Sequence, residues 1–466
     1  MNRLFFLSIL LLFFSGTLKE YAGIADETVE LIAMLTWAGI VLAKARSVRL
    51  DGIVKIGMGY LIWVFLSGIV NECPLSDWIL FGRNMAALLF FYIIINTMDW
   101  DETQCRSFVC LLVLIAAVQI VVSFLHLLCY GATEYRVGTL FFGGGGMANN
   151  LMIALCGYAM VWYYWSSRKV KDLWWLLGLV LIGLASGKRS TVLIYPLFLM
   201  GSLFCCSILS RKFSHLVRLA VVAVVVAFIT SFLLVYMDNL GGYNKRAYHS
   251  LWDRLDGAVH YALEYEDRGY ETSFSTTFGR LANSKLMGQY LLSGDFEPFW
   301  FGEGPMTCSK RYAWVARERY CFGYGVSGWT DEILSIGVPG LLLGIAFYLG
   351  LLYQLIKRNT LPQLNHTGKM LYVGSIMQAI VFLFVHFFYN SLFLNSLHLQ
   401  IFYITGCVLL INPRYRACFL EQQPASEADS RLHACALDVR DKTFSMSHLL
   451  IPTGPNTVLH GNIRES

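Results

Sequence analysis

Long apolar runs recur along most of this chain and constrain its fold more than any other feature. A run of about 15 to 22 apolar residues can cross the hydrocarbon core of a bilayer as a helix. The sequence holds about twelve such runs, at residues 4–17, 29–44, 53–71, 80–98, 107–130, 146–166, 173–187, 191–209, 216–237, 333–356, 369–388 and 394–412. We therefore predict an all-α polytopic membrane protein.

The composition agrees with this class. The chain is 56% hydrophobic and 14% charged, with a mean hydropathy of +0.55, whereas a soluble domain carries about 25% charged residues. The net charge of +5 is modest, and no basic tract or zinc-ligand spacing points to a nucleic-acid partner. No acidic or histidine cluster has the spacing of metal ligands, so we expect neither a metal nor another cofactor.

Orientation follows from the lysines and arginines of the short loops, which gather on the cytoplasmic side. The loops around residues 44–49, 106, 168–171, 211–212 and 357–369 are basic, as is the start of the tail at 414–416, which places both termini in the cytoplasm. The first run follows Arg3 and is short enough for a signal peptide. No clear cleavage site follows Ser15-Gly16-Thr17, which favours an uncleaved first span.

One long polar stretch, from roughly Asp238 to Asp331, separates the ninth and tenth predicted spans. The orientation places it outside, and a loop of about 90 residues is large enough to hold a substrate. We therefore divide the chain into a membrane part at 1–237, this outer loop at 238–331, a second membrane part at 332–412, and a polar, weakly ordered cytoplasmic tail at 413–466.

Several charged residues lie at the outer ends of the predicted spans. Lys188 and Arg189 stand in a tight hairpin between two apolar runs and can bind an anion, because guanidinium donors suit phosphate oxygens. The alternative is a pair that extends to the headgroups. Arg136 precedes a run of four glycines at 143–146, which lacks the rest of a phosphate-loop motif and suits a flexible turn. Asn149 follows and can hydrogen-bond a sugar or the backbone.

The outer loop itself has order. Residues 246–265 have apolar positions at helical spacing and include Arg254, which predicts an amphipathic helix. A second helix is predicted at 275–292 and includes Arg280. A turn-rich stretch at 297–305 contains Glu303, and a basic and aromatic stretch follows at 310–320. For any one of these residues, ordinary packing or a solvated face is the alternative to binding.

The outer loop also contains two cysteines. In an oxidising compartment Cys308 and Cys321 can form a disulfide, which would close a loop of about 14 residues and contribute roughly 3 kcal/mol in the chain-entropy model. Cys73, in a short outer loop, is a competing partner. The remaining cysteines show no paired spacing and suit small apolar positions.

Four local motifs, in this order, resemble the O-antigen polymerase and O-antigen ligase superfamily of bacterial polysaccharide assembly. They are Arg136-Val137-Gly138-Thr139 with Asn149, the hairpin Ser186-Gly187-Lys188-Arg189-Ser190, Arg280 with the stretch 297–304, and the start of the following span at 331–340. Ligases of this family carry a histidine shortly before that span, but residues 325–330 contain none. This departure favours a polymerase over transfer to lipid A core.

The resemblance implies glycosyl transfer at the periplasmic face of the bacterial inner membrane. A hydroxyl of one undecaprenyl-diphosphate-linked oligosaccharide would attack the anomeric carbon of another, and the lipid diphosphate would leave. Membrane lipid would surround the site, with a chain-length regulator and a flippase as further partners. Preplaced cations would stabilise the leaving diphosphate, and the best candidates in the sequence are Arg189, Arg280, Arg136 and Lys188.

The same reaction calls for a base within about 3 Å of the incoming hydroxyl. Candidates are Glu303, Asp331, Glu332 and Asp295. His386, at the outer end of the eleventh predicted span, can line the cavity together with Asn390, or it can form a packed interhelical hydrogen bond. A lipid-linked oligosaccharide flippase or another transporter is the alternative of a different class, although such folds usually contain two similar halves, and no internal repeat is visible here.

Overall fold

The computed structural model describes most of the chain, namely residues 2–48, 50–130, 138–140, 145–165, 175, 178, 191–210, 217, 221, 224, 269–272, 275–278, 280–292, 296–307, 327–388 and 397–421. The chain forms two units, Met1–Leu420 and Glu421–Ser466. Every helix and strand given below belongs to the first unit. The predicted helix at 246–265 lies outside the described residues.

Almost all of the described residues are helical. The α-helices are α1 (Asn2–Phe13), α2 (Ser15–Ala22), α3 (Asp26–Ala43), α4 (Gly52–Val70), α5 (Leu75–Thr97), α6 (Glu102–Tyr130), α7 (Gly145–Trp165), α9 (Thr191–Ser210), α12 (Arg280–Leu292), α13 (Phe296–Phe301), α15 (Gly328–Arg358), α16 (His366–Phe388), α18 (Leu397–Ile411) and α19 (Pro413–Arg416). Short 3-10 turns are η1 (Ala45–Ser47), η3 (Leu361–Gln363) and η4 (Ala417–Phe419), and the strands are β1 (Gly269–Thr272) and β2 (Ser275–Phe278).

Five of these helices, α4, α5, α6, α15 and α16, are long and apolar enough to cross a membrane. Helices α1 and α2 meet at a bend of 66°, and they add a sixth candidate span if the bent pair is counted as one. Shorter apolar stretches lie at 198–210 in α9 and in α18. The protein is therefore an α-helical, multi-pass membrane protein, as predicted. The number of about twelve spans remains a prediction, since the runs at 173–187 and 216–237 fall almost wholly outside the described residues.

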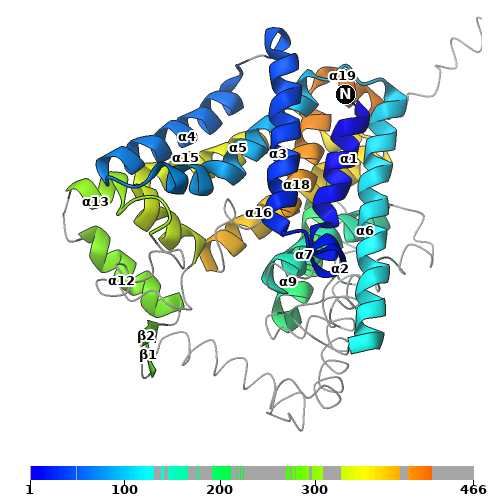
Figure 1. Cartoon of the computed structure of the whole chain (residues 1–466). Helices are drawn as coiled ribbons and strands as arrows, with labels where there is room; N and C mark the ends of the chain where they lie inside the picture. The colour runs from blue at the N-terminus through cyan, green and yellow to red at the C-terminus, as the bar shows by residue number, and fades with distance from the viewer. Residues whose placement is uncertain are drawn as a thin grey trace, which may run out of the picture. The chain divides into compact units, whose positions relative to one another are not determined.

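The helices pack in a connected series. Helix α4 packs on both α5 and α15, and α16 packs on α15, α18, α7 and α9 (Figure 1). Helix α5 also contacts α3 and α18, and α3 contacts α1. Every residue of α18 is buried, which agrees with its largely apolar sequence, because a helix that is hydrophobic all round is an interior helix.

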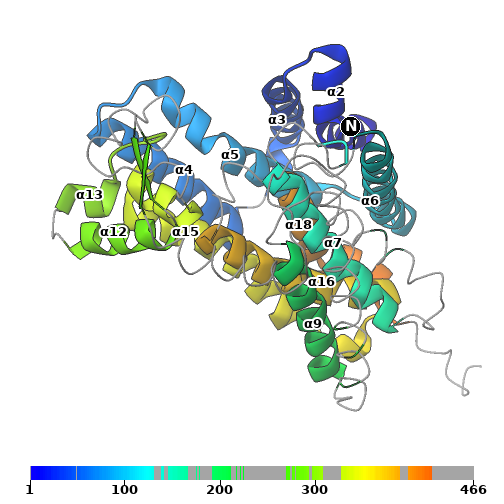
Figure 2. The ribbon, with the colours of Figure 1, turned by 90° about the horizontal axis from the view of Figure 1, so that it is seen from below.

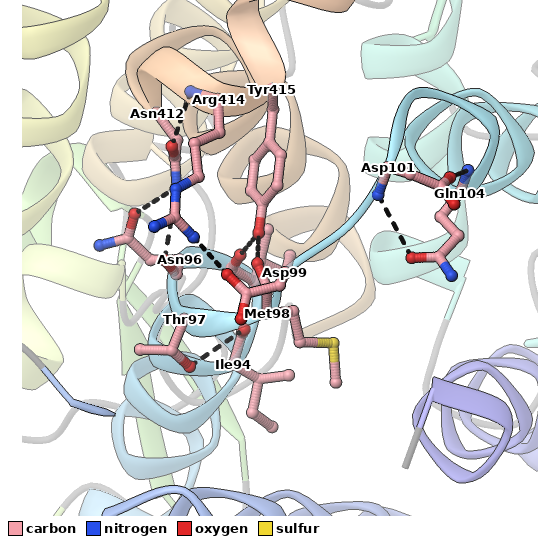
Figure 3. A network of polar contacts seen from close by, with 11 residues as sticks. Ile94, Asn96, Thr97, Met98, Asp99, Asp101, Gln104, Asn412, Arg414 and Tyr415 are labelled. Carbon is pink, nitrogen blue, oxygen red and sulfur yellow. Dashed lines mark hydrogen bonds and ion pairs between the residues drawn. The ribbon is translucent and has the colours of Figure 1, made fainter. Parts of the chain in front are cut away.

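One polar network ties the ends of α5 and α18 together (Figure 3). The Asn412 side chain donates to the backbone oxygen of Asn96 at 3.3 Å, and Arg414 pairs with Asp99. The Tyr415 hydroxyl donates to the carbonyl groups of Ile95 and Met98. These bonds use carbonyl groups that the last turn of α5 leaves without helical partners. They fix this end of the bundle, which the basic loops predict to be cytoplasmic.

The segment before α12 differs from the prediction. Residues 275–278 form β2, which pairs antiparallel with β1 in the register Gly269↔Phe278, and the helix begins only at Arg280. The predicted helix at 275–292 was therefore wrong over its first residues. Thr276 and Thr277 explain the difference, since β-branched side chains favour strands over helices.

Candidate functional site

A break inside α15 organises the best-defined polar site of the described chain. Gly337 has φ 72° and ψ 178°, a conformation essentially restricted to glycine, and Pro339 follows. Because Pro339 has no N–H, it cannot donate to the carbonyl of Ser335 one turn earlier. The break thus leaves backbone acceptors inside an apolar helix, where unpaired polar groups are costly.

Two side chains of α4 satisfy these acceptors. The Ser67 hydroxyl donates to the Ser335 carbonyl at 3.0 Å, and Trp63 Nε1 donates to the Ile336 carbonyl at 2.9 Å. Both positions lie in the apolar run predicted as the third span. The sequence analysis did not predict this role, although the sequence contains a signal for it. A serine and a tryptophan four residues apart lie on one face of a helix. A Gly-x-Pro sequence in another span leaves carbonyl groups that need such donors.

The turn after α13 docks onto this break. The Phe301 ring stacks on Trp63, with 5.2 Å between ring centroids and 9° between planes, and its carbonyl accepts a bond from Ser67 at 2.6 Å. Gly302 follows at φ 67°, and the Glu303 N–H donates to the Leu334 carbonyl at 2.6 Å. A Cβ atom at Gly302 would lie 2.6 Å from the Leu334 oxygen, so glycine alone permits this approach.

Helix α12 completes the support of Glu303. Met287 and Tyr290 pack against Ile333 and Leu334 of α15, and Figure 2 shows α12 and α13 beside that helix. The Tyr290 hydroxyl donates to Oε1 of Glu303 at 3.4 Å. The Glu303 carboxylate is partly exposed and is held from two sides, by its own backbone on α15 and by a tyrosine of α12.

The start of α15 adds two more carboxylates, Asp331 in the first turn and Glu332 directly after it. Asp331 is partly exposed, and its Oδ1 lies 3.5 Å from the Ser335 hydroxyl. Glu332 is buried, and its Oε2 lies 3.6 Å from Nε2 of His386, which is also buried. Carboxylates are stabilised by the positive end of the helix dipole at such a position. The structure therefore brings Glu303, Asp331 and His386 to the same end of α15.

The surroundings of the buried pair are apolar and aromatic. Glu332 lies close enough to Tyr60 of α4 and Tyr348 of α15 for electrostatic interaction with both. His386 was predicted either to line a cavity or to pack between helices, and it packs against Glu332. The pairing with Glu332 was not predicted, because nothing in the sequence relates residue 332 to residue 386.

The remaining predicted site residues cannot be placed in this way. Arg136, Lys188, Arg189, Arg254, Cys308, Cys321, Asp295 and Asn390 lie outside the described residues. Arg280 and Asn149 are placed only by their backbones, as the first residue of α12 and a residue of α7. Cys73, the competing disulfide partner, is a free thiol that lies against Gly304.

One predicted motif has a structural role in its described part. Thr139 donates to the Phe13 carbonyl at the bend between α1 and α2, and its N–H donates to the Gln119 side chain at 2.8 Å. Gly138 has φ 64° and lies so close to Gln119 that a Cβ would collide with it. Gly138 and Thr139 thus hold the bend of the first predicted span against α6.

The site offers carboxylates in two environments. Glu303 and Asp331 are partly exposed and can accept a proton from a hydroxyl. Glu332 and His386 form a buried pair whose two side chains can share a proton. Among the described residues, no group of three acidic, histidine or cysteine side chains is placed to hold a metal ion. No family model matches this chain, and a comparison with curated proteins gives no match either.

Proposed function

We propose that this protein is an integral-membrane glycosyltransferase that polymerises oligosaccharide units carried on undecaprenyl diphosphate, at the periplasmic face of the bacterial inner membrane. The proposal rests on the order of motifs in the sequence and on one structural observation. The turn at 302–304 and the start of α15, which resemble two separate motifs of the polymerase and ligase superfamily, contact each other through the Glu303–Leu334 hydrogen bond.

The contact supports the proposal because it brings these two motifs, which are separate in the sequence, to one site. Glu303 and Asp331 come to the same end of α15, where either carboxylate can act as the base for an incoming sugar hydroxyl. The buried pair of Glu332 and His386 lies behind them, next to Asp331 in the chain. In this proposal Arg189, Arg280, Arg136 and Lys188 surround the leaving diphosphate, which gains negative charge in the transition state.

The experiment compares glycan lengths in cells that lack the gene and are complemented with variants. Glu303→Gln and Arg189→Ala should both leave single repeat units on the surface lipid, while the protein reaches the membrane at its normal level. Glu102→Gln is the matched control, because Glu102 is an exposed glutamate of α6 and lies outside the four motifs. Its variant should make glycans of normal length. Normal glycan length with both Glu303→Gln and Arg189→Ala contradicts the proposal.

Loss of the gene also separates the related activities. A polymerase defect gives single units on the surface lipid. A ligase defect removes surface glycan while long chains accumulate on the carrier lipid. Either pattern identifies one activity within the same superfamily.

A transporter of lipid-linked oligosaccharide is the second candidate, and one observation favours it. Transporters use broken helices and buried ionisable pairs within the membrane, and α15 has both a break at Gly337 and the Glu332–His386 pair. If repeat units accumulate on the cytoplasmic face in cells that lack the gene, this candidate replaces the polymerase.

A further inference from the structure

Helix α13 exposes several aromatic side chains on one face, which is unfavourable for a loop surrounded by water. The side chains of Phe296, Phe299 and Trp300 are 70%, 37% and 40% exposed, and Leu292 at the end of α12 is 86% exposed. The three rings touch, with centroid distances of 5.9 Å between Phe296 and Trp300 and 5.8 Å between Phe299 and Trp300. Exposed apolar patches of this kind mark sites of contact with a protein or a membrane.

The opposite side of the same short helix is fixed to the bundle. Phe301 stacks on Trp63, and the carbonyl of Trp300 lies so close to Gly337 that a Cβ there would collide with it. The aromatic face is therefore held in one place by α4 and α15. It differs from a mobile loop tip, because the Phe301 carbonyl is bonded to α4 and the turn that follows is bonded to α15, both candidate membrane spans.

Helix α13 docks close to the end of one of these candidate spans. Ser67, which bonds to Phe301, lies one turn before the end of α4 at Val70. Trp78 of α5 lies at the same level, since its ring packs edge-on against Phe65. Tryptophan and other aromatic residues gather where the ends of spans meet the headgroups.

The spans on which α13 docks also expose apolar side chains. The two spans that support α13 expose many apolar side chains along their length, namely Ile62, Phe65, Leu66, Ile69 and Val70 on α4 and Leu342, Leu349, Tyr353 and Ile356 on α15. Because α4 and α15 are long and apolar enough to cross a bilayer, side chains exposed on them are expected to contact lipid.

We propose that α13 is an interfacial membrane helix that lays Phe296, Phe299 and Trp300 into the boundary between headgroups and acyl chains. Short amphipathic segments bind there through their apolar face while the polar face stays in water. The turn that carries Glu303 begins directly after this helix. Glu303 is thus held at headgroup level, the level at which a lipid-anchored molecule presents its polar part. The inference depends on the membrane assignment and is independent of the proposed reaction.

Photocrosslinking of the full chain in phospholipid nanodiscs tests this placement. The photoreactive residue p-benzoylphenylalanine replaces Phe296 or Trp300, and mass spectrometry measures covalent adducts with phospholipid. Leu342 on α15 is the positive control, because it is 59% exposed on a candidate span. Glu297 on α13 is the matched negative control, since it is exposed on the same helix as a charged residue.

We expect the two aromatic sites to give lipid adducts at a yield close to that of Leu342 and several-fold above that of Glu297. A lipid adduct at Leu342 with none at Phe296 and Trp300 overturns the inference. Adducts with a second protein at these sites, in place of lipid, overturn it as well and assign the patch to a protein partner. The readout needs no enzymatic activity, so its failure is distinct from a failure of the proposed function.

Discussion

Replacing Gly337 with alanine tests whether the break in α15 is required. The backbone conformation of Gly337 is essentially inaccessible to residues with a Cβ, and such strain costs about 1–3 kcal/mol. The new Cβ would also collide with the carbonyl of Trp300. Only a movement of α13 relieves that collision, and the Glu303–Leu334 hydrogen bond, worth about 1 kcal/mol, is then lost.

We therefore expect Gly337→Ala to lower the free energy of unfolding by about 2–4 kcal/mol. The variant does not regain this stability by forming a regular helix through residue 337, because Pro339 opposes a regular helix at this point. The assay heats detergent-solubilised protein and measures the fraction that stays monodisperse. A clear decrease in the midpoint temperature is the expected result, together with a loss of whatever activity depends on Glu303.

Gly288→Ala is the matched control. Gly288 lies on α12 with no atom near its missing Cβ, and alanine is favoured over glycine in a helix by about 1 kcal/mol. The control should be as stable as the wild type or slightly more stable. If Gly337→Ala has the same midpoint temperature as the wild type, the positive φ of Gly337 and its close contact with Trp300 are refuted.

Three further changes test separate contacts. Ser67→Ala removes the single hydroxyl donor that two backbone carbonyls share and should cost about 1–3 kcal/mol. Thr36→Ala removes an exposed bond within one helix and should leave the midpoint unchanged. Asn412→Ala removes the cap of α19 and the link to α5 and should cost about 0.5–2 kcal/mol, measured by the same heating assay. Burial opposes ionisation of Asp26, but its hydrogen bonds, above all that from Lys19, outweigh burial and lower its pKa. A lowered pKa stabilises the fold above the pKa of the unfolded state, and this stability is lost as the pH falls through the folded value. Asp26→Asn should therefore destabilise the protein slightly at neutral pH and not in strong acid, and an equal effect at both would contradict this pairing.

Hydropathy predicted the described spans well, except where polar residues enter a helix. The run predicted at 53–71 matches α4, which spans Gly52–Val70. The run predicted at 333–356 is too short, because α15 begins at Gly328 and includes Asp331 and Glu332. The two acidic residues interrupt the apolar pattern of the sequence, but the helix accommodates both. Asp331 is partly exposed, and Glu332 lies against a histidine of another helix.

The candidate site was predictable only in part. The stretch at 297–305 was identified as rich in turn residues and the stretch at 331–340 through the family resemblance, and both lie at the break of α15. Their donors on α4 and the tyrosine that contacts Glu303 were not identified. These contacts join residues far apart in the chain, and a single sequence records no such pairing.

The sequence by itself determined the class of this protein, because apolar runs of membrane-spanning length leave few other folds open. The break in α15 was not predicted, although Gly337 and Pro339 permit it through local geometry. The tertiary structure alone decided which partners make that break tolerable. A broken helix in an apolar environment is stable only where another element supplies hydrogen bonds, and here Ser67 and Trp63 supply them. The same packing decided that Glu332 meets His386 and that α13 holds its aromatic face outward.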